Sequence, residues 1–199
     1  MKTKLISCLL VLLMMFAFST GAKADSYFGQ VTITPGYPFV VNIVDNGSFL
    51  SFCLEMDEAI AGGNIYNAYL NNAAVAGGVG GGEPDPVDPL TVYLYTNFLS
   101  GASYNPLALQ VAIWDIEEES PYALVTYQSY KPLADTYIAD AITALANGWQ
   151  PTIGVYALNL YTLDGALAQD FLSVPEPMTL LLLGLGLLGI GITRKRFAK

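Results

Sequence analysis

The sequence predicts an α+β fold, with a single ectodomain of β-hairpin and sheet elements and a helical part. Three observations predict this class. Alternating apolar and polar residues mark strands early in the ectodomain, helix-start signals appear in its middle, and a strand-like pattern returns near its end. Because strands flank the helices without a repeating strand–helix–strand unit, the class is α+β rather than α/β.

The first predicted elements are two strands. Val31 and Ile33 alternate with polar neighbours, and a β-branched stretch at 39–44 follows the turn Pro35-Gly36. These features are typical of strands that bury one face and expose the other.

A hairpin is expected around Asn46-Gly47, which separates the stretch 39–44 from residues 48–54. Asn-Gly between two apolar runs is a strong hairpin signal, because both residues tolerate the positive φ of a type I′ turn. Cys53 should then lie late in the second strand. By strand alternation it would share a face with Phe49 and Ser51.

Helices are expected in the middle of the ectodomain, separated by a Gly-rich and then acidic, Pro-rich loop at 77–88. The Ala- and Asn-rich segment 65–75 could form a helix, and the apolar segment 90–99 fits a helix or a strand, of which we favour the helix. The segment 107–118 has the clearest signal, because Asn105 is a good N-cap and Pro106 suits the first helical position.

The remaining elements are a third helix and a closing strand. The helix covers 132–146 and stops at Asn147-Gly148, and the strand covers 153–161. The segment 107–118 ends in the acidic residues 117–119, which oppose the helix dipole and therefore indicate that these carboxylates have another role.

The amino-terminal residues 1–24 have the pattern of a secretory signal peptide. Lys2 and Lys4 precede an apolar run at 5–18, and Ala22-Lys23-Ala24 offers a small-residue cleavage site. The working protein should therefore begin near Asp25, outside the inner membrane.

The carboxyl-terminal residues 173–199 form three parts in a fixed order. Pro175, Glu176 and Pro177 form an extended, exposed motif, an apolar run at 178–192 follows as a transmembrane segment, and a basic cluster ends the chain. The basic cluster consists of Arg194, Lys195 and Arg196. By the positive-inside rule it stays in the cytoplasm.

This tail resembles the PEP-CTERM sorting signal of exopolysaccharide-producing Gram-negative bacteria. The resemblance implies that an exosortase processes the chain, that the inner membrane anchors it transiently, and that it reaches the cell surface or extracellular matrix. An ordinary single-span anchor is the alternative interpretation.

The composition excludes several classes of function. The ectodomain, taken as residues 25–172, has 16 of the 17 acidic residues of the chain and a single Lys, Lys131, which gives a formal charge of −15. Such a charge repels nucleic acid, and it makes Ca²⁺ binding on an acidic surface conceivable, although we expect no cofactor. Without any His, catalytic triads and His-ligated metals are excluded, so we expect no enzyme.

Carboxylates are the remaining groups for chemistry. Two acidic groups stand out, one after the predicted Cys53 strand and one on the predicted helix 107–118; they are Glu55, Asp57 and Glu58, and Asp115, Glu118 and Glu119. Paired carboxyls could serve a hydrolase, but we favour a solvated acidic surface.

Cys53 is the only Cys of the ectodomain, because Cys8 lies in the signal peptide. An exported protein with one Cys has no internal disulfide to make. Three explanations are open: a buried inert thiol, an intermolecular disulfide, or a thiol already capped by another group.

The segments 52–55 (Phe-Cys-Leu-Glu) and 109–114 (Leu-Gln-Val-Ala-Ile-Trp) resemble the paired motifs of bacterial thioester domains. The second motif there is typically Thr-Gln-x-Ala-Ile-Trp, so Gln110 and Trp114 match while Leu109 departs. The resemblance implies an internal thioester between Cys53 and Gln110 in an adhesin that attaches covalently to amines, for instance in a biofilm.

Helical spacing supports this pairing on physical grounds. Trp114 lies four residues after Gln110 on the same helix face, where it could cover the bond, and Leu107 lies three residues before Gln110 and extends the stripe. A base would have to be a carboxylate such as Glu55 or Asp57. The alternative is that this stripe is ordinary packing and that Cys53 is a small buried hydrophobe.

A second class of function is a passive exopolysaccharide-binding or structural matrix module without a thioester. Five aromatic residues offer stacking faces in that case, although most of them are expected in the core. They are Tyr66, Tyr69, Tyr93, Tyr95 and Trp149.

Overall fold

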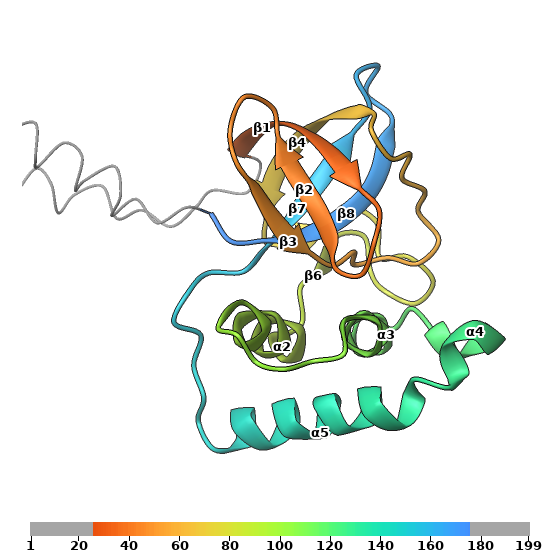
Figure 1. The fold of residues 1–199 in the computed structure, drawn as a ribbon, viewed down its shortest axis with the longest axis vertical. Coiled ribbons are helices and arrows are strands. Elements are labelled where there is room, and N and C mark those ends of the chain that lie inside the picture. Colours follow the sequence, from red (N-terminus) through yellow and green to blue (C-terminus); the bar gives the residue numbers. More distant parts are fainter. Residues whose placement is uncertain (1–25, 176–199) are drawn as a thin grey trace, which may run out of the picture.

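The computed structural model describes residues 26–175, in which a curled antiparallel sheet lies over two layers of helices (Figure 1). The six strands of the sheet are β1 (Ser26–Thr34), β2 (Phe39–Ile43), β3 (Ser48–Ser51), β4 (Ile65–Asn71), β7 (Tyr156–Tyr161) and β8 (Leu167–Ser173). They lie in the order β3-β2-β1-β4-β7-β8, and every neighbouring pair is antiparallel. The short strands β5 (Ala73–Ala74) and β6 (Asp85–Pro86) form a separate pair.

The sheet curls until its two edges meet. The Ser51 hydroxyl at the end of β3 donates to the Leu172 carbonyl of β8 at 2.6 Å, and Cys53 forms an antiparallel bridge with Phe171. The segment that follows β3 is therefore held against the last strand of the chain. Closure of this kind covers backbone groups that an open edge would leave unpaired.

Three longer helices pack beneath the sheet, as Figure 1 shows. They are α2 (Pro89–Leu99), α3 (Pro106–Ile116) and α5 (Lys131–Ala146), and the short η1 (Pro121–Ala123) and α4 (Val125–Gln128) join α3 to α5. Every residue of α3 from Ala108 to Trp114 is buried, because the sheet covers one side of α3 and α5 contacts the other. A helix that is apolar on all sides, as α3 is, needs such a position.

The structure confirms most of the predicted helices and their caps. Helices occur where 90–99, 107–118 and 132–146 were expected. The Asn105 side chain caps α3 by accepting a hydrogen bond from the Ala108 N–H, and Asp88 caps α2 in the same way. The hairpin β2–β3 is also confirmed, but the expected type I′ turn is wrong, because the positive φ belongs to Asp45 rather than to Asn46-Gly47.

One predicted element is wrong, and another is confirmed as a strand but is not the last one. The segment 65–75 is not a helix, because its first seven residues form β4, where Tyr66 and Ala68 point into the core between β1 and β7. The strand within 153–161 is confirmed as β7, but it does not close the domain. The strand β8 follows it and pairs along its outer edge.

The expected position of Cys53 on a strand with alternating faces is also wrong. Strand β3 ends at Ser51, and every residue from Ser51 to Glu55 is buried. The alternation is lost because β8 covers one side of this segment and α3 covers the other.

No helix in the part of the chain from 26 to 175 is long and apolar enough to cross a membrane. The predicted signal peptide at 1–24 and the predicted transmembrane segment at 178–192 lie outside the described residues.

Candidate functional site

Cys53 and Gln110 lie in direct contact in the core, although 57 positions separate them in the sequence. The Gln110 Oε1 accepts a hydrogen bond from the Cys53 N–H at 3.0 Å, and Gln110 Nε2 donates to the Cys53 carbonyl at 2.8 Å. The Cys53 Sγ lies 3.4 Å from the same Oε1. Both side chains are buried, with Cys53 at 2% and Gln110 at 0% exposure.

The backbone of the Cys53 segment explains why an amide side chain fits here. The Leu54 N–H donates to the Asp170 carbonyl, and the Leu172 N–H donates to the Phe52 carbonyl. In an extended chain the N–H and C=O of the residue in between point to the opposite side, so those of Cys53 turn away from β8. The N–H and C=O of Cys53 would be unpaired in the core without the Gln110 side chain, which reaches them from α3.

The Cys53 thiol is held in its protonated form. Burial raises the pKa of the Cys53 thiol well above its usual range, and the nearby carboxyl of Glu55 raises it further. The indole N–H of Trp114 opposes this increase, although it has no hydrogen-bond partner of ordinary geometry. Any reaction of this sulfur therefore needs a group that takes up its proton.

Glu55 is the better placed of the carboxylates that the sequence suggested as a base. It is buried, and burial and the charges of Asp170 and Glu58 raise its pKa to about 10. Asp57 is exposed at the surface. The Glu55 carboxyl is therefore neutral at pH 7 in the absence of a cation, and in that form it can donate a proton.

Trp114, whose indole N–H lies near the Cys53 thiol, belongs to an aromatic cluster. Trp114, which is 4% exposed, packs edge-on against Tyr37 at 6.3 Å between ring centroids and tilted against Tyr127 at 5.2 Å. The hydroxyls of Tyr37 and Tyr127 lie 3.5 Å apart and join the loop before β2 to α4. Burial and this hydrogen bond raise the pKa of Tyr37, and the Cys53 sulfur adds to the increase.

Leu109 of the motif and Leu107 just before it differ in their environment. Leu107, which was expected to cover the pair together with Trp114, is only half-buried at the start of α3. Leu109, which departs from the usual Thr, is completely buried in the core. An apolar side chain suits that position, because a hydroxyl there would need a buried partner.

The expectation that the carboxylates form a solvated acidic surface is wrong for Glu55 and Glu119, and two further carboxylates, Glu117 and Asp170, are buried as well. Glu55, Glu117, Glu119 and Asp170 are all at most 7% exposed. They accept hydrogen bonds from main-chain N–H groups of distant segments, which compensates part of the cost of burial.

The acidic end of α3 has the separate role that its unfavourable charge indicated. Glu119 accepts from the Met56 N–H at 2.8 Å and from the Val79 N–H at 2.9 Å, and Glu117 accepts from the Asp88 N–H at 3.2 Å. These carboxylates hold the loop after Cys53 and the Gly-rich loop against α3.

Sequence reasoning missed Tyr37, Tyr127 and Asp170 as members of this region. No local pattern marks them, because each comes close to the pair only through the fold. The one available signal was the Gln-Asp pair at 169–170, which is polar inside a run with strand-forming residues.

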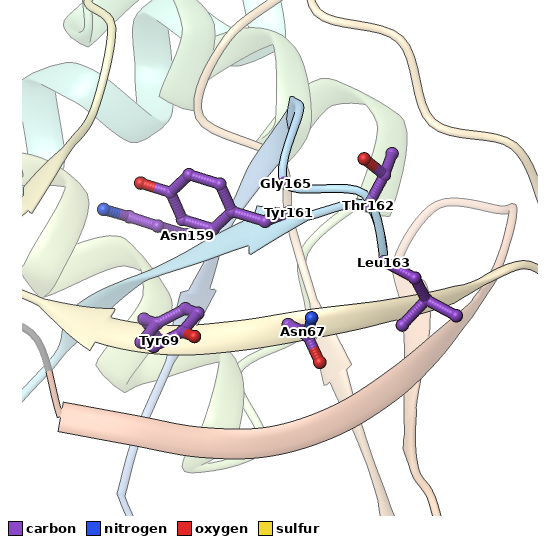
Figure 2. A pocket seen from close by; sticks show the side chains of 7 residues that line it. All are labelled: Asn67, Tyr69, Asn159, Tyr161, Thr162, Leu163 and Gly165. Carbon is purple, nitrogen blue, oxygen red and sulfur yellow. The ribbon is translucent and has the colours of Figure 1, made fainter.

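The aromatics proposed for stacking on a polysaccharide are divided between core and surface. Tyr66 and Tyr95 are buried, as expected, while Tyr93 packs edge-on against Trp149 at 5.0 Å. Tyr69 lines an open pocket of about 360 Å³ across β4 and β7 (Figure 2). Its other lining residues are Asn67, Asn159, Tyr161, Thr162, Leu163 and Gly165.

One comparison with known proteins bears on the carboxyl end. A family model described as the PEP-CTERM protein-sorting motif matches residues 173–196. Residues 173–196 thus carry a PEP-CTERM sorting motif. The motif supports an exosortase substrate and indicates export to the cell surface or extracellular space. No curated protein and no solved structure matches the chain.

The PEP-CTERM match begins at the end of the folded domain. Ser173 is the last residue of β8, and Pro175 is the last residue that the structure describes. The other predicted sorting residues, Glu176, Pro177 and the basic cluster 194–196, lie outside the described residues.

Proposed function

We propose that this exported, exosortase-sorted protein is a surface adhesion or biofilm protein that attaches covalently to amines through a thioester between Cys53 and Gln110. The observation that carries the proposal is the contact of Cys53 Sγ with Gln110 Oε1 at 3.4 Å, with the carboxamide fixed by two hydrogen bonds. Partners held in this way react with a large effective concentration.

Thioester formation is an exchange of ammonia for sulfur. The Cys53 sulfur adds to the Gln110 carbonyl carbon, a carbon–sulfur bond forms, the carbon–nitrogen bond breaks, and ammonia leaves with the proton of the thiol. The Cys53 N–H points at Oε1, where negative charge develops, and stabilises it as an oxyanion-hole donor does.

The proton of the thiol has to reach the leaving nitrogen. Glu55 lies two residues from Cys53 and its charge acts on the sulfur. A neutral Glu55 carboxyl supplies a proton to the departing nitrogen and takes up the proton of the thiol. This role makes Glu55 a proton-transfer residue of the proposed self-processing step.

The thioester then reacts once with an amine. The amine nitrogen bonds to the Gln110 carbonyl carbon, the carbon–sulfur bond breaks, and the sulfur recovers a proton as a thiol. A single reaction without turnover is a covalent attachment, in keeping with the expectation that the protein is not an enzyme. The Tyr37–Trp114–Tyr127 cluster keeps water from the bond until an amine enters.

The test is the intact mass of the exported protein, compared with that of a Cys53→Ser variant from the same host. The comparison cancels uncertainty in where the two ends are processed. After correction for the mass difference between Cys and Ser, wild type should be lighter than the variant by one ammonia. Treatment of wild type with methylamine should then add the mass of methylamine and release one thiol. Fragment masses should place the methylamide on Gln110.

Two controls sharpen this test. A Gln110→Ala variant should show the full mass and no methylamine adduct. A wild-type protein of full mass, whose Cys53 reacts with iodoacetamide without prior methylamine, would exclude the thioester.

A second candidate is a module that binds exopolysaccharide without a covalent bond. The pocket of Figure 2 favours it, because Tyr69 and Asn67 on β4 and Tyr161 and Asn159 on β7 combine aromatic faces with amides. Retention of the Cys53→Ser protein on the native polysaccharide, together with its loss in Tyr69→Ala, would support this function. Equal retention of Tyr69→Ala and wild type would exclude the pocket.

A further inference from the structure

Three carboxylates converge behind the Cys53–Gln110 pair. Glu55, Glu58 and Asp170 each direct one oxygen into the same space, and these oxygens lie within 4.8 Å of one another. Glu55 and Glu58 come from the segment after Cys53, while Asp170 comes from β8. The fold therefore brings a local pair and a distant residue together at one point.

Two oxygens of these three carboxylates lack any partner in the part of the chain that is described. Glu55 is 2% exposed and its Oε1 makes no hydrogen bond, and the buried Oε2 of Glu58 makes none. An unpaired buried carboxylate oxygen is costly, so the arrangement indicates a group that these oxygens bind. Lys131 does not supply it, because its ammonium pairs with Asp135 at 2.7 Å.

The other oxygens are held by donors that orient the cluster. Asp170 accepts from the Val75 N–H at 2.8 Å and from the Leu160 N–H at 3.3 Å. Glu55 Oε2 accepts from the Asp170 N–H at 3.3 Å and from the Gln169 amide at 3.4 Å. These bonds fix two of the three carboxylates and leave Glu55 Oε1 without a hydrogen bond.

We propose that Glu55, Glu58 and Asp170 bind one calcium ion. The ligands are all hard oxygens without His or Cys, which suits Ca²⁺ or Mg²⁺. Oxygens bound to one Ca²⁺ at 2.3–2.6 Å are at most about 5 Å apart, which agrees with the observed spread. Ca²⁺ tolerates irregular ligand sets, and Glu58 is only partly buried, which leaves a side for water and for exchange of the ion.

The ion links the segment after Cys53 to β8, beside the bridge that closes the sheet. The ion allows the three carboxyl groups to be ionised together, because its charge compensates their mutual repulsion, and it thereby stabilises the closed sheet. The site goes beyond the proposed attachment chemistry. Its ligands include neither Cys53 nor Gln110, but it shares Glu55 with the proposed proton transfer, so Glu55 binds the ion as a carboxylate only when it is not serving that step in its neutral form.

The test is calcium titration of the whole exported protein after treatment with EDTA. Calorimetry with CaCl₂ at pH 7.5 should show one site with a Kd on the order of 10⁻⁴ to 10⁻³ M, as in other extracellular modules. The melting temperature should rise with CaCl₂, and MgCl₂ should act more weakly. Wild type that neither binds nor gains stability in millimolar CaCl₂ overturns the proposal.

Variants place the site. Glu58→Gln and Asp170→Asn should each weaken Ca²⁺ binding at least tenfold, while Asp57→Asn, an exposed carboxylate between the two Glu ligands, should bind as wild type does. Glu58→Gln decides the matter if Asp170→Asn fails to fold, because Glu58 is only partly buried. Undiminished binding in Glu58→Gln, or an equal loss in Asp57→Asn, contradicts the assignment. Cys53→Ser should bind normally, which separates this site from the thioester.

Discussion

The side chain of Gln110 pairs with both main-chain groups of Cys53, at 3.0 and 2.8 Å, as a neighbouring strand would. On the other side of the same segment, Phe52 and Leu54 pair with β8. One carboxamide thus completes the hydrogen bonding of a closed edge and is aligned with a thiol. Its structural role and its proposed chemical role use the same atoms.

Gln110→Ala should therefore destabilise the domain by about 2–4 kcal/mol, because it leaves two buried peptide groups unpaired and opens a cavity. Urea unfolding measures this loss. The matched control is Gln128→Ala, which removes an exposed amide bonded to the Tyr122 carbonyl and should change stability by less than about 0.5 kcal/mol. Similar values for the two variants would contradict the pairing of Cys53 with Gln110.

Tyr37→Ala should open the aromatic cluster and speed the reaction of methylamine with the protein several-fold, because Tyr37 is the exposed member that covers Trp114. The rate is followed by the appearance of the methylamide on Gln110. Tyr37→Phe keeps the ring and loses only the contact with the Tyr127 hydroxyl, so its rate should stay closer to wild type. Equal rates in all three proteins would show that the cluster does not control access.

Gly78→Ala should lower the melting temperature by several degrees. Gly78 has a φ of +53°, and a Cβ there would collide with the Glu119 carboxylate, which holds the Met56 and Val79 N–H groups. Gly47→Ala is the matched control, since its Cβ would meet no atom within 4 Å and its φ is not positive. Scanning calorimetry of both variants compares them, and a neutral Gly78→Ala would refute the close packing.

The stability of the domain should fall as the pH rises from about 4.5 to about 7, in part because of Glu117. Burial raises the pKa of Glu117 from 4.5 to about 7, so the unfolded chain ionises first and is favoured as the pH increases. The full shift corresponds to at most on the order of 3 kcal/mol. Glu117→Gln keeps an acceptor for the Asp88 N–H and should flatten this part of the profile.

Urea unfolding at several pH values in the presence of EDTA measures the profile. Asp57→Asn serves as the control, because it removes a carboxylate from the surface rather than from the interior. A Glu117→Gln protein that keeps the full wild-type slope would show that Glu117 is not the buried acid responsible.

Signals confined to neighbouring residues predicted much of this fold. The predicted cap Asn105 makes a local hydrogen bond to the first turn of its helix, and the structure confirms that helix as well as the helix expected at 90–99. The helix prediction for 65–75 is wrong because Ala and Asn are uncommon in strands, so the local composition argued against one. The position of residues 65–71 between β1 and β7 favours a strand all the same. Tertiary contacts of that kind leave no trace in a short window of sequence.

The residues of the candidate site also fall into those that the sequence predicted and those that it did not. Cys53 and Gln110 were recognisable by their motifs, and the structure brings the two side chains together as expected. The carboxylates near them were misjudged, because charge patterns say nothing of burial. Asp170 reaches Glu55 only through the closure of the sheet, across 115 positions of sequence.

The junction of β8 with the sorting motif has a mechanical consequence. Tension applied at the carboxyl end enters the domain at Ser173 and runs along β8, whose hydrogen bonds to β7 and to the segment 52–54 are then loaded in shear. Hydrogen bonds that are loaded in shear all carry part of the force at the same time. Such a force would thus pass through the same strand that lies against Cys53.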